Sequence, residues 1–252
     1  LTITRFNSEH IYLNNSDNNE ISGNTSYNAN GAIVLASSNN NTITNNIMSF
    51  IQGVSAGGII MTSSNYNVID GNSITSSVLT GSLGYGLSDN GTNNIITNNS
   101  ITTSLAIGSV RLTGTNSYTV FSGNFIGSDA TTFTGTYINA TNNTFSGSVT
   151  ISGNNNTMSD NKVAGSITNS GSNTSITGNS VTISINASSG TYVNIENNTV
   201  SAASGTAITV GSSNGSITGN TIITPTTTGI SVTGANNTVS SNTITNSGGA
   251  TA

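Results

Sequence analysis

The sequence of 252 residues has no cysteine, no tryptophan and a single proline. Without cysteine it can form neither a disulfide framework nor a thiolate metal site. Only 4% of the residues are charged and only three are Lys or Arg, whereas about 25% charged residues is usual for soluble proteins. Nucleic acids and anionic lipids are bound by clusters of Lys and Arg, so this shortage, with a net charge of −5, argues against both as partners.

Long apolar runs are also missing. None approaches the roughly 20 residues of a transmembrane helix, so we expect no insertion into a membrane. The first ten residues, LTITRFNSEH, lack a basic stretch followed by an apolar core, so a signal peptide is expected to be absent or already removed. Disorder is not expected either, because hydrophobic residues make up 33% of the chain and Ile and Val recur at regular positions.

What the chain does contain is a short motif repeated eleven times. Each copy has an apolar residue, two small polar ones, an asparagine, any residue and a second apolar one, as in SITGNTI at 216–222. Successive copies are 22, 26, 27, 25, 19, 18, 18, 19, 22 and 22 residues apart, and a period of roughly 20 residues is typical of solenoids. The shared asparagines, here called the ladder asparagines, are Asn24, Asn46, Asn72, Asn99, Asn124, Asn143, Asn161, Asn179, Asn198, Asn220 and Asn242.

The spacing inside each unit is that of β-strands. Apolar residues alternate with polar ones, as in TAITV at 206–210, which is the period of two that a strand requires. A second apolar pair usually precedes the motif, as at Ile33/Leu35, Ile59/Met61, Val149/Ile151, Ile208/Val210 and Ile230/Val232. Units this short have no room for a crossover helix, and leucine-rich repeats are disfavoured because Leu is scarce.

The sequence therefore predicts an all-β protein, a parallel β-helix of about eleven coils with three short strands per coil. It predicts one domain over 1–252, with 244–252 as a flexible tail or inter-subunit linker. The motif asparagine is expected to lie at a sharp corner, where positive φ favours Gly, Asn or Asp. Stacked about 4.8 Å apart, the asparagine amides would hydrogen-bond along the solenoid as an internal ladder.

On these repeats the chain resembles the right-handed parallel β-helix proteins of the pectin-lyase-like superfamily. It is most similar to the NosD-type and to archaeal and bacterial cell-surface β-helix proteins, whose repeats read Ile-x-x-Asn-x-Ile. The resemblance covers essentially the whole chain and implies the right-handed fold. It implies little about function, because the superfamily contains lyases, hydrolases, epimerases, tailspikes, adhesins and structural proteins.

The sequence offers no catalytic pair of carboxylates. Acid–base cleavage of a sugar needs two carboxyls roughly 5–10 Å apart. In the register of the repeats, Asp70 lies between two threonines on adjacent coils, and so does Glu196. We therefore predict that the protein is not an enzyme, with no catalytic residue and no cofactor. One acidic cluster, Glu9, His10, Asp17 and Glu20, has the ligand types for a divalent metal, but a solvated first coil is the preferred interpretation and no metal site is predicted.

Two surface features remain. A Thr-x-Thr array would suggest ice binding, but the first column of that face is mixed (Glu20, Thr42, Val68, Ile95, Val120, Asn139), so ice binding is less expected. Sequons are frequent, as expected by chance in a chain so rich in Ser and Thr, and a secreted protein could carry glycans on them. The possible N-glycosylation sites are Asn14, Asn24, Asn40, Asn90, Asn98, Asn139, Asn142, Asn155, Asn173, Asn186, Asn197, Asn214 and Asn236.

These observations predict a non-catalytic, extracellular structural protein, a subunit of a cell-surface layer, sheath or filament. The alternative is a carbohydrate-binding adhesin or a degenerate polysaccharide-active β-helix protein. The expected partner is a second copy stacked end to end, with cell-surface glycans also considered. In that joint, Leu1 of one copy would fall near the place of Ile230. A fragment whose end caps lie outside this sequence is the other explanation of the uncapped ends.

Overall fold

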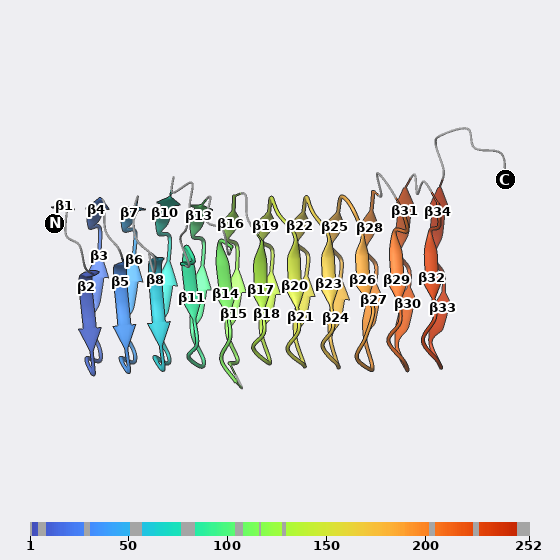
Figure 1. Ribbon diagram of the computed structural model, residues 1–252, viewed down its shortest axis with the longest axis horizontal. Helices are drawn as coiled ribbons and strands as arrows, with labels where there is room; N and C mark the ends of the chain where they lie inside the picture. The colour runs from blue at the N-terminus through green and yellow to red at the C-terminus, as the bar shows by residue number, and fades with distance from the viewer. Residues whose placement is uncertain are drawn as a thin grey trace.

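The computed structural model describes residues 2–4, 9–27, 31–50, 57–76, 84–103, 108–115, 117–127, 130–201, 205–223 and 227–245. Within these ranges every regular element is a β-strand, and the strands form three parallel sheets (Figure 1). The predicted all-β parallel solenoid is confirmed. No helix in the described part of the chain is long and apolar enough to cross a membrane.

The three sheets, here called A, B and C, run the length of the solenoid. Sheet A has 12 strands: β1 (Thr2–Thr4), β4 (Thr25–Tyr27), β7 (Ile47–Phe50), β10 (Ser73–Ser76), β13 (Ser100–Thr103), β16 (Phe125–Ile126), β19 (Thr144–Phe145), β22 (Lys162–Val163), β25 (Ser180–Val181), β28 (Thr199–Val200), β31 (Thr221–Ile223) and β34 (Thr243–Thr245). Sheet B has 11: β2 (Glu9–Asn14), β5 (Gly31–Ala36), β8 (Gly57–Thr62), β11 (Leu87–Asp89), β14 (Val110–Leu112), β17 (Thr131–Phe133), β20 (Val149–Ile151), β23 (Ile167–Asn169), β26 (Ile185–Ala187), β29 (Ile208–Val210) and β32 (Ile230–Val232). Sheet C also has 11: β3 (Glu20–Ser22), β6 (Thr42–Thr44), β9 (Val68–Asp70), β12 (Ile95–Thr97), β15 (Val120–Ser122), β18 (Asn139–Thr141), β21 (Thr157–Ser159), β24 (Ser175–Thr177), β27 (Asn194–Glu196), β30 (Ser216–Thr218) and β33 (Thr238–Ser240).

Each coil passes through sheet B, then sheet C, then sheet A, so the eleven coils lie side by side from the blue to the red end of Figure 1. The register follows the sequence repeat. Ile176, for example, pairs with Met158 on one side and Ile195 on the other. The spacing of the repeats varies mainly between sheet A and the next sheet B strand: β4 ends at Tyr27 and β5 begins at Gly31, whereas β10 ends at Ser76 and β11 begins at Leu87. The predicted tail began at residue 244, but Ile244 and Thr245 belong to β34; residues 246–252 lie outside the described ranges.

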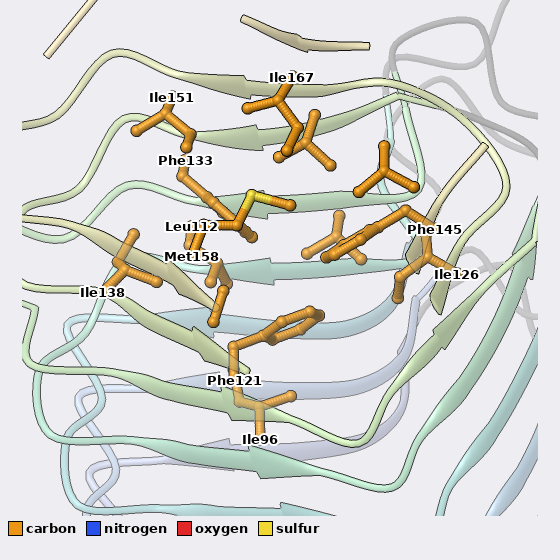
Figure 2. Packing of buried hydrophobic residues seen from close by; sticks show 14 of the residues in the cluster. Ile96, Leu112, Phe121, Ile126, Phe133, Ile138, Phe145, Ile151, Met158 and Ile167 are labelled. Carbon is orange, nitrogen blue, oxygen red and sulfur yellow. The ribbon is translucent and has the colours of Figure 1, made fainter. Parts of the chain in front are cut away.

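The core is the space that the three sheets enclose, because every second residue of each strand points inward. In the middle coils the inward residues are 0–1% exposed, and their side chains point toward one another in Figure 2. Phe121 pairs in register with Ala140, so a large side chain lies beside a small one. The ring of Phe121 packs against those of Phe133 and Phe145, with centroids 5.8 and 6.3 Å apart. No coil could bury these residues alone.

The corner between sheets C and A explains which residues precede the asparagine in each copy of the motif. The residue with positive φ is the one before each ladder asparagine, as at Gly178 (φ 68°) before Asn179 and Asn197 (φ 54°) before Asn198. In every one of the eleven coils that preceding residue has positive φ, and it is Gly, Asn, Asp or Ser. The expectation that the ladder asparagine itself supplies the positive φ is therefore wrong; its place is fixed by the hydrogen bonds described next.

Candidate functional site

The ladder asparagines form an unbroken chain of hydrogen bonds inside the solenoid. The Oδ1 atom of Asn198 accepts two hydrogen bonds from Asn179, one from its backbone N–H at 2.9 Å and one from its Nδ2 at 3.0 Å. The same pair of contacts joins every ladder asparagine to the next, from Asn24 to Asn242. Nδ2 of Asn179 also donates to the carbonyl of Met158 at 2.8 Å. From Asn46 to Asn220 these side chains are at most 2% exposed, so the network is buried and satisfied.

A second, shorter ladder lies at the corner between sheets B and C, here called the B–C corner. It consists of Asn19, Asn41, Asn67 and Asn94, each the fifth residue before a ladder asparagine, and each Oδ1 after the first accepts the N–H and Nδ2 of the preceding one. The repeated motif by itself did not predict this ladder. Aligning the repeats at that position would have shown it, because four successive copies carry asparagine there.

The second ladder ends on a buried carboxylate. The next coil has Thr119 in place of asparagine, and Nδ2 of Asn94 donates instead to Oδ1 of Asp89 at 2.8 Å. Asp89 is 1% exposed and also accepts from the N–H of Gly91 at 2.8 Å and the hydroxyl of Thr119 at 3.2 Å. Burial raises the pKa of the Asp89 carboxyl above its ordinary range, against the opposing effect of these three hydrogen bonds.

This raised pKa predicts a pH dependence of stability. Above the ordinary pKa of an aspartate, about 3.9, the unfolded chain loses a proton that folded Asp89 keeps, so stability falls as the pH rises through the folded pKa. Asp89→Asn retains an oxygen acceptor for Gly91 and Asn94 and removes the titration. We expect its melting temperature to match that of the wild type near pH 4 and to exceed it at pH 7.

The control for the lost charge is Glu196→Gln, on the outer face of sheet C. Thermal unfolding followed by circular dichroism at both pH values measures the effect. If the melting temperatures of Asp89→Asn and wild type differed by the same amount at pH 4 and pH 7, the inference of a raised pKa at Asp89 would be contradicted.

The carboxylates on the outer faces are separated from one another, as expected. Asp70 is paired in register with Thr44 and Thr97, and its Oδ1 accepts from the hydroxyl of Thr97 at 2.7 Å and from Nδ2 of Asn98 at 2.8 Å. Glu196 pairs with Thr177 and Thr218. Neither carboxylate has a second one in the paired position on an adjacent coil, so the geometry for acid–base cleavage of a sugar is not present at either position.

The side chains of the acidic cluster in the first coil do not come together at one site. Oε1 of Glu20 accepts from the hydroxyl of Ser22 at 2.9 Å, Oδ1 of Asp17 accepts from the N–H of Asn39 at 2.6 Å, and Nδ1 of His10 is hydrogen-bonded to the hydroxyl of Ser26 at 2.6 Å. Glu9 lies at the start of β2. Within the described ranges no group of three His, Cys, Asp or Glu residues is placed to hold a metal ion.

The outer face of sheet C has the mixed column that the sequence suggested. In register, Glu20, Thr42, Val68, Ile95, Val120 and Asn139 follow one another along that face. Ile95 is 42% exposed, so bulky apolar side chains interrupt the hydroxyls. This part of the sheet lacks the continuous threonine array that an ice-binding surface would need.

The sequon asparagines all lie in the described ranges, and most are exposed. Eight of them occupy corner positions with positive φ: Asn40, Asn98, Asn142, Asn155, Asn173, Asn197, Asn214 and Asn236. Asn24 differs, because its Nδ2 donates to Oδ1 of Asn46 at 3.0 Å, and a glycan on that nitrogen would displace a ladder contact. Glycosylation at these positions stays a prediction.

The B–C corner also has a residue with positive φ in every coil, the sixth before each ladder asparagine. Seven coils use asparagine there: Asn18, Asn40, Asn93, Asn155, Asn173, Asn214 and Asn236. The other four use tyrosine: Tyr66 (φ 57°), Tyr118 (φ 43°), Tyr137 (φ 59°) and Tyr192 (φ 56°). Asparagine tolerates this conformation, whereas for a bulky side chain it is an outlier that costs on the order of 1 kcal/mol or more. The four rings are nevertheless 40–59% exposed.

Comparison with known proteins places the chain in a family. The model of the family described as "Periplasmic copper-binding protein (NosD)" matches residues 2–154, and that of the "Right handed beta helix region" matches residues 181–252. No curated protein gives a match. The resemblance inferred from the repeats, and with it the right-handed fold, is confirmed. The first match covers more than half of the chain, and the protein therefore belongs to the NosD family.

Proposed function

We propose that this protein is a non-catalytic structural element that works outside the cytoplasm as a rod built from stacked coils. The observation that carries the proposal is the contrast between its interior and its surface. The same pair of hydrogen bonds joins the ladder asparagines of all eleven coils, while the outer carboxylates Asp70 and Glu196 stand singly among threonines. The family description, a periplasmic protein, supports a location beyond the cytoplasmic membrane.

Copper binding, which the family description names, does not fit the residues of this chain. Copper is held by His, Cys and Met side chains, and the sequence has one His, three Met and no Cys. Met48, Met61 and Met158 are 0–1% exposed within the apolar core. Nδ1 of His10 is engaged with Ser26, and the described residues contain no metal-ligating cluster. The proposed function does not involve the metal.

Incubation with neutral and acidic polysaccharides tests the non-catalytic part of the proposal. We expect no release of reducing ends and no unsaturated product. Asp70→Asn and Glu196→Gln are the matched variants, because these carboxylates lie on the outer face of sheet C. Turnover by the wild type that is lost in either variant would overturn the proposal.

The two ends of the described solenoid are complementary, which supports a second copy as the partner. At the red end of Figure 1, Val239 of sheet C and Ile244 of sheet A are 49% and 52% exposed, although the residues paired with them, Ile217 and Ile222, are buried. Each ladder asparagine donates its N–H and Nδ2 toward the next coil, so Asn242 presents a donor at this end. Asn24, at the other end, presents an Oδ1 acceptor. A head-to-tail joint would therefore extend the ladder from Asn242 to Asn24.

The register of this joint differs from the one expected from the sequence. Leu1 lies outside the described residues, and the strand after it, β1, pairs with β4 in sheet A. Strand β1 therefore lies in sheet A and not in sheet B with Ile230. A joint that extends the ladder would set β4 of one copy on β34 of the other, so β1 would have to leave its place beside β4. β2 and β3 would then stack on β32 and β33. The sequence could not assign LTITRF to one sheet, because it resembles strands of more than one. The pairing of β1 with β4 makes that assignment.

We expect the particle mass to increase with protein concentration in light scattering. Val239→Lys and Ile244→Lys together would keep the protein monomeric, because both side chains are already exposed and the added charges would meet the apolar end of the next copy. Ile47→Lys with Ile95→Lys is the control, since these apolar residues are similarly exposed on outer faces. A monomer at high concentration with an intact β signal, or assembly that the end variants do not change, would rule out stacking.

A further inference from the structure

Four exposed tyrosines lie along one edge of the solenoid. Tyr66, Tyr118, Tyr137 and Tyr192 occupy the same position of the B–C corner in four coils, at the lower edge of Figure 1. The rings of Tyr118 and Tyr137, on consecutive coils, are stacked with centroids 4.6 Å apart and planes 13° from parallel. We propose that this tyrosine row binds a neutral polysaccharide that lies along the edge.

The fold itself gives no reason for tyrosine at these positions. Asparagine makes the same turn in the other seven coils and adopts positive φ with less strain. The tyrosine rings gain little from burial, because 59%, 51%, 40% and 58% of Tyr66, Tyr118, Tyr137 and Tyr192 is exposed. Stacking between rings can offset the backbone strain only at Tyr118 and Tyr137, because the coils on either side of Tyr66 and of Tyr192 have asparagine at this position. Strained residues held at the surface point to a role in binding.

The chemistry of the edge favours a neutral sugar polymer. The electron-rich face of an aromatic ring attracts the weakly positive C–H groups on one face of a pyranose. Tyrosine offers this surface with only two side-chain torsions to fix. The residues immediately before Tyr66, Tyr137 and Tyr192 are Asn65, Thr136 and Thr191, which carry hydrogen-bonding groups and no charge. A nucleic acid or an acidic polymer would require Lys or Arg beside the rings.

The spacing of the coils suits a chain of sugars. Neighbouring coils are about 4.8 Å apart, which is close to the length of one pyranose in an extended polymer. From Tyr66 to Tyr192 the row spans six such spacings, about 29 Å. A polysaccharide following this edge would contact several of the four tyrosines at once, and the asparagine corners between them would offer amides to its hydroxyls.

The direct test replaces Tyr118 and Tyr137 by asparagine, the residue that most coils have at this corner. Tyr118→Asn with Tyr137→Asn should fold with an unchanged or higher melting temperature. The control is Tyr12→Thr with Tyr27→Thr, which removes two exposed tyrosines from the outer faces of sheets B and A. Both variants leave the ladder and the core intact.

Binding is measured by affinity electrophoresis in gels containing hydroxyethylcellulose, laminarin, mannan or polygalacturonate. We expect at least one neutral polymer to retard the wild type and the Tyr12/Tyr27 control, and the Tyr118/Tyr137 variant to bind at least tenfold more weakly. The chain has no tryptophan, so quenching of tyrosine emission by the same polymer provides a second readout.

Three results would overturn the proposal. The first is migration unaffected by all three neutral polymers. The second is retardation that the Tyr118/Tyr137 variant keeps or that only polygalacturonate causes. The third is a self-association in light scattering that this variant abolishes, which would make a second copy the occupant of the row. None of them bears on the end-to-end joint, which has its own variants at Val239 and Ile244.

Discussion

Replacing Phe121 by alanine is expected to lower the free energy of unfolding by about 3–5 kcal/mol. Phe121 is fully buried, and its ring packs against Phe133 and Phe145. The residue paired with it on the next coil is Ala140, which is too small to fill the space. Because the coils are held at fixed spacing by three sheets, the cavity cannot collapse far.

Phe125→Ala is the matched control, since Phe125 lies in the same coil but is 44% exposed on the outer face of sheet A. Thermal unfolding followed by circular dichroism compares the two variants. If Phe121→Ala and Phe125→Ala had the same melting temperature, the aromatic cluster would not be the packing centre of the middle coils.

Replacing Asn179 by valine is expected to lower the free energy of unfolding by about 2–4 kcal/mol, because several buried polar groups each lose a hydrogen-bond partner. Valine is close to asparagine in size, but it removes the Oδ1 that accepts the N–H and Nδ2 of Asn161 and the Nδ2 that donates to the carbonyl of Met158. The loss comes from the ladder and not from the corner, since the positive φ belongs to Gly178.

The control for this substitution is Asn194→Val, which places valine at an exposed position of β27, where it has good strand propensity. Guanidinium unfolding of both variants, followed by circular dichroism, measures the difference. Equal midpoints for Asn179→Val and wild type would show that the hydrogen bonds between ladder asparagines contribute little to stability.

The sequence alone determined the solenoid, its three strands per coil and the ladder asparagines. These features repeat at fixed offsets, and a strand's alternation is local, so one coil predicts the next. The inward column from Ile21 to Ile217 follows from that alternation, and so does the pairing of Phe121 with Ala140. The absence of an adjacent carboxylate at Asp70 and Glu196 could be predicted in the same way, because the register fixes each neighbour.

Only the tertiary structure decided features that depend on how one coil meets another. Asp89 and Thr119 are 30 residues apart, and they come together with Asn94 only because coils of unequal length stack in register. The structure also moved the positive φ from the ladder asparagine to the residue before it, since Gly, Asn, Asp and Ser are equally compatible with the motif until the backbone is seen. Likewise, the four tyrosines are scattered singly through the sequence, and it is the stacking of the coils that brings them to one edge.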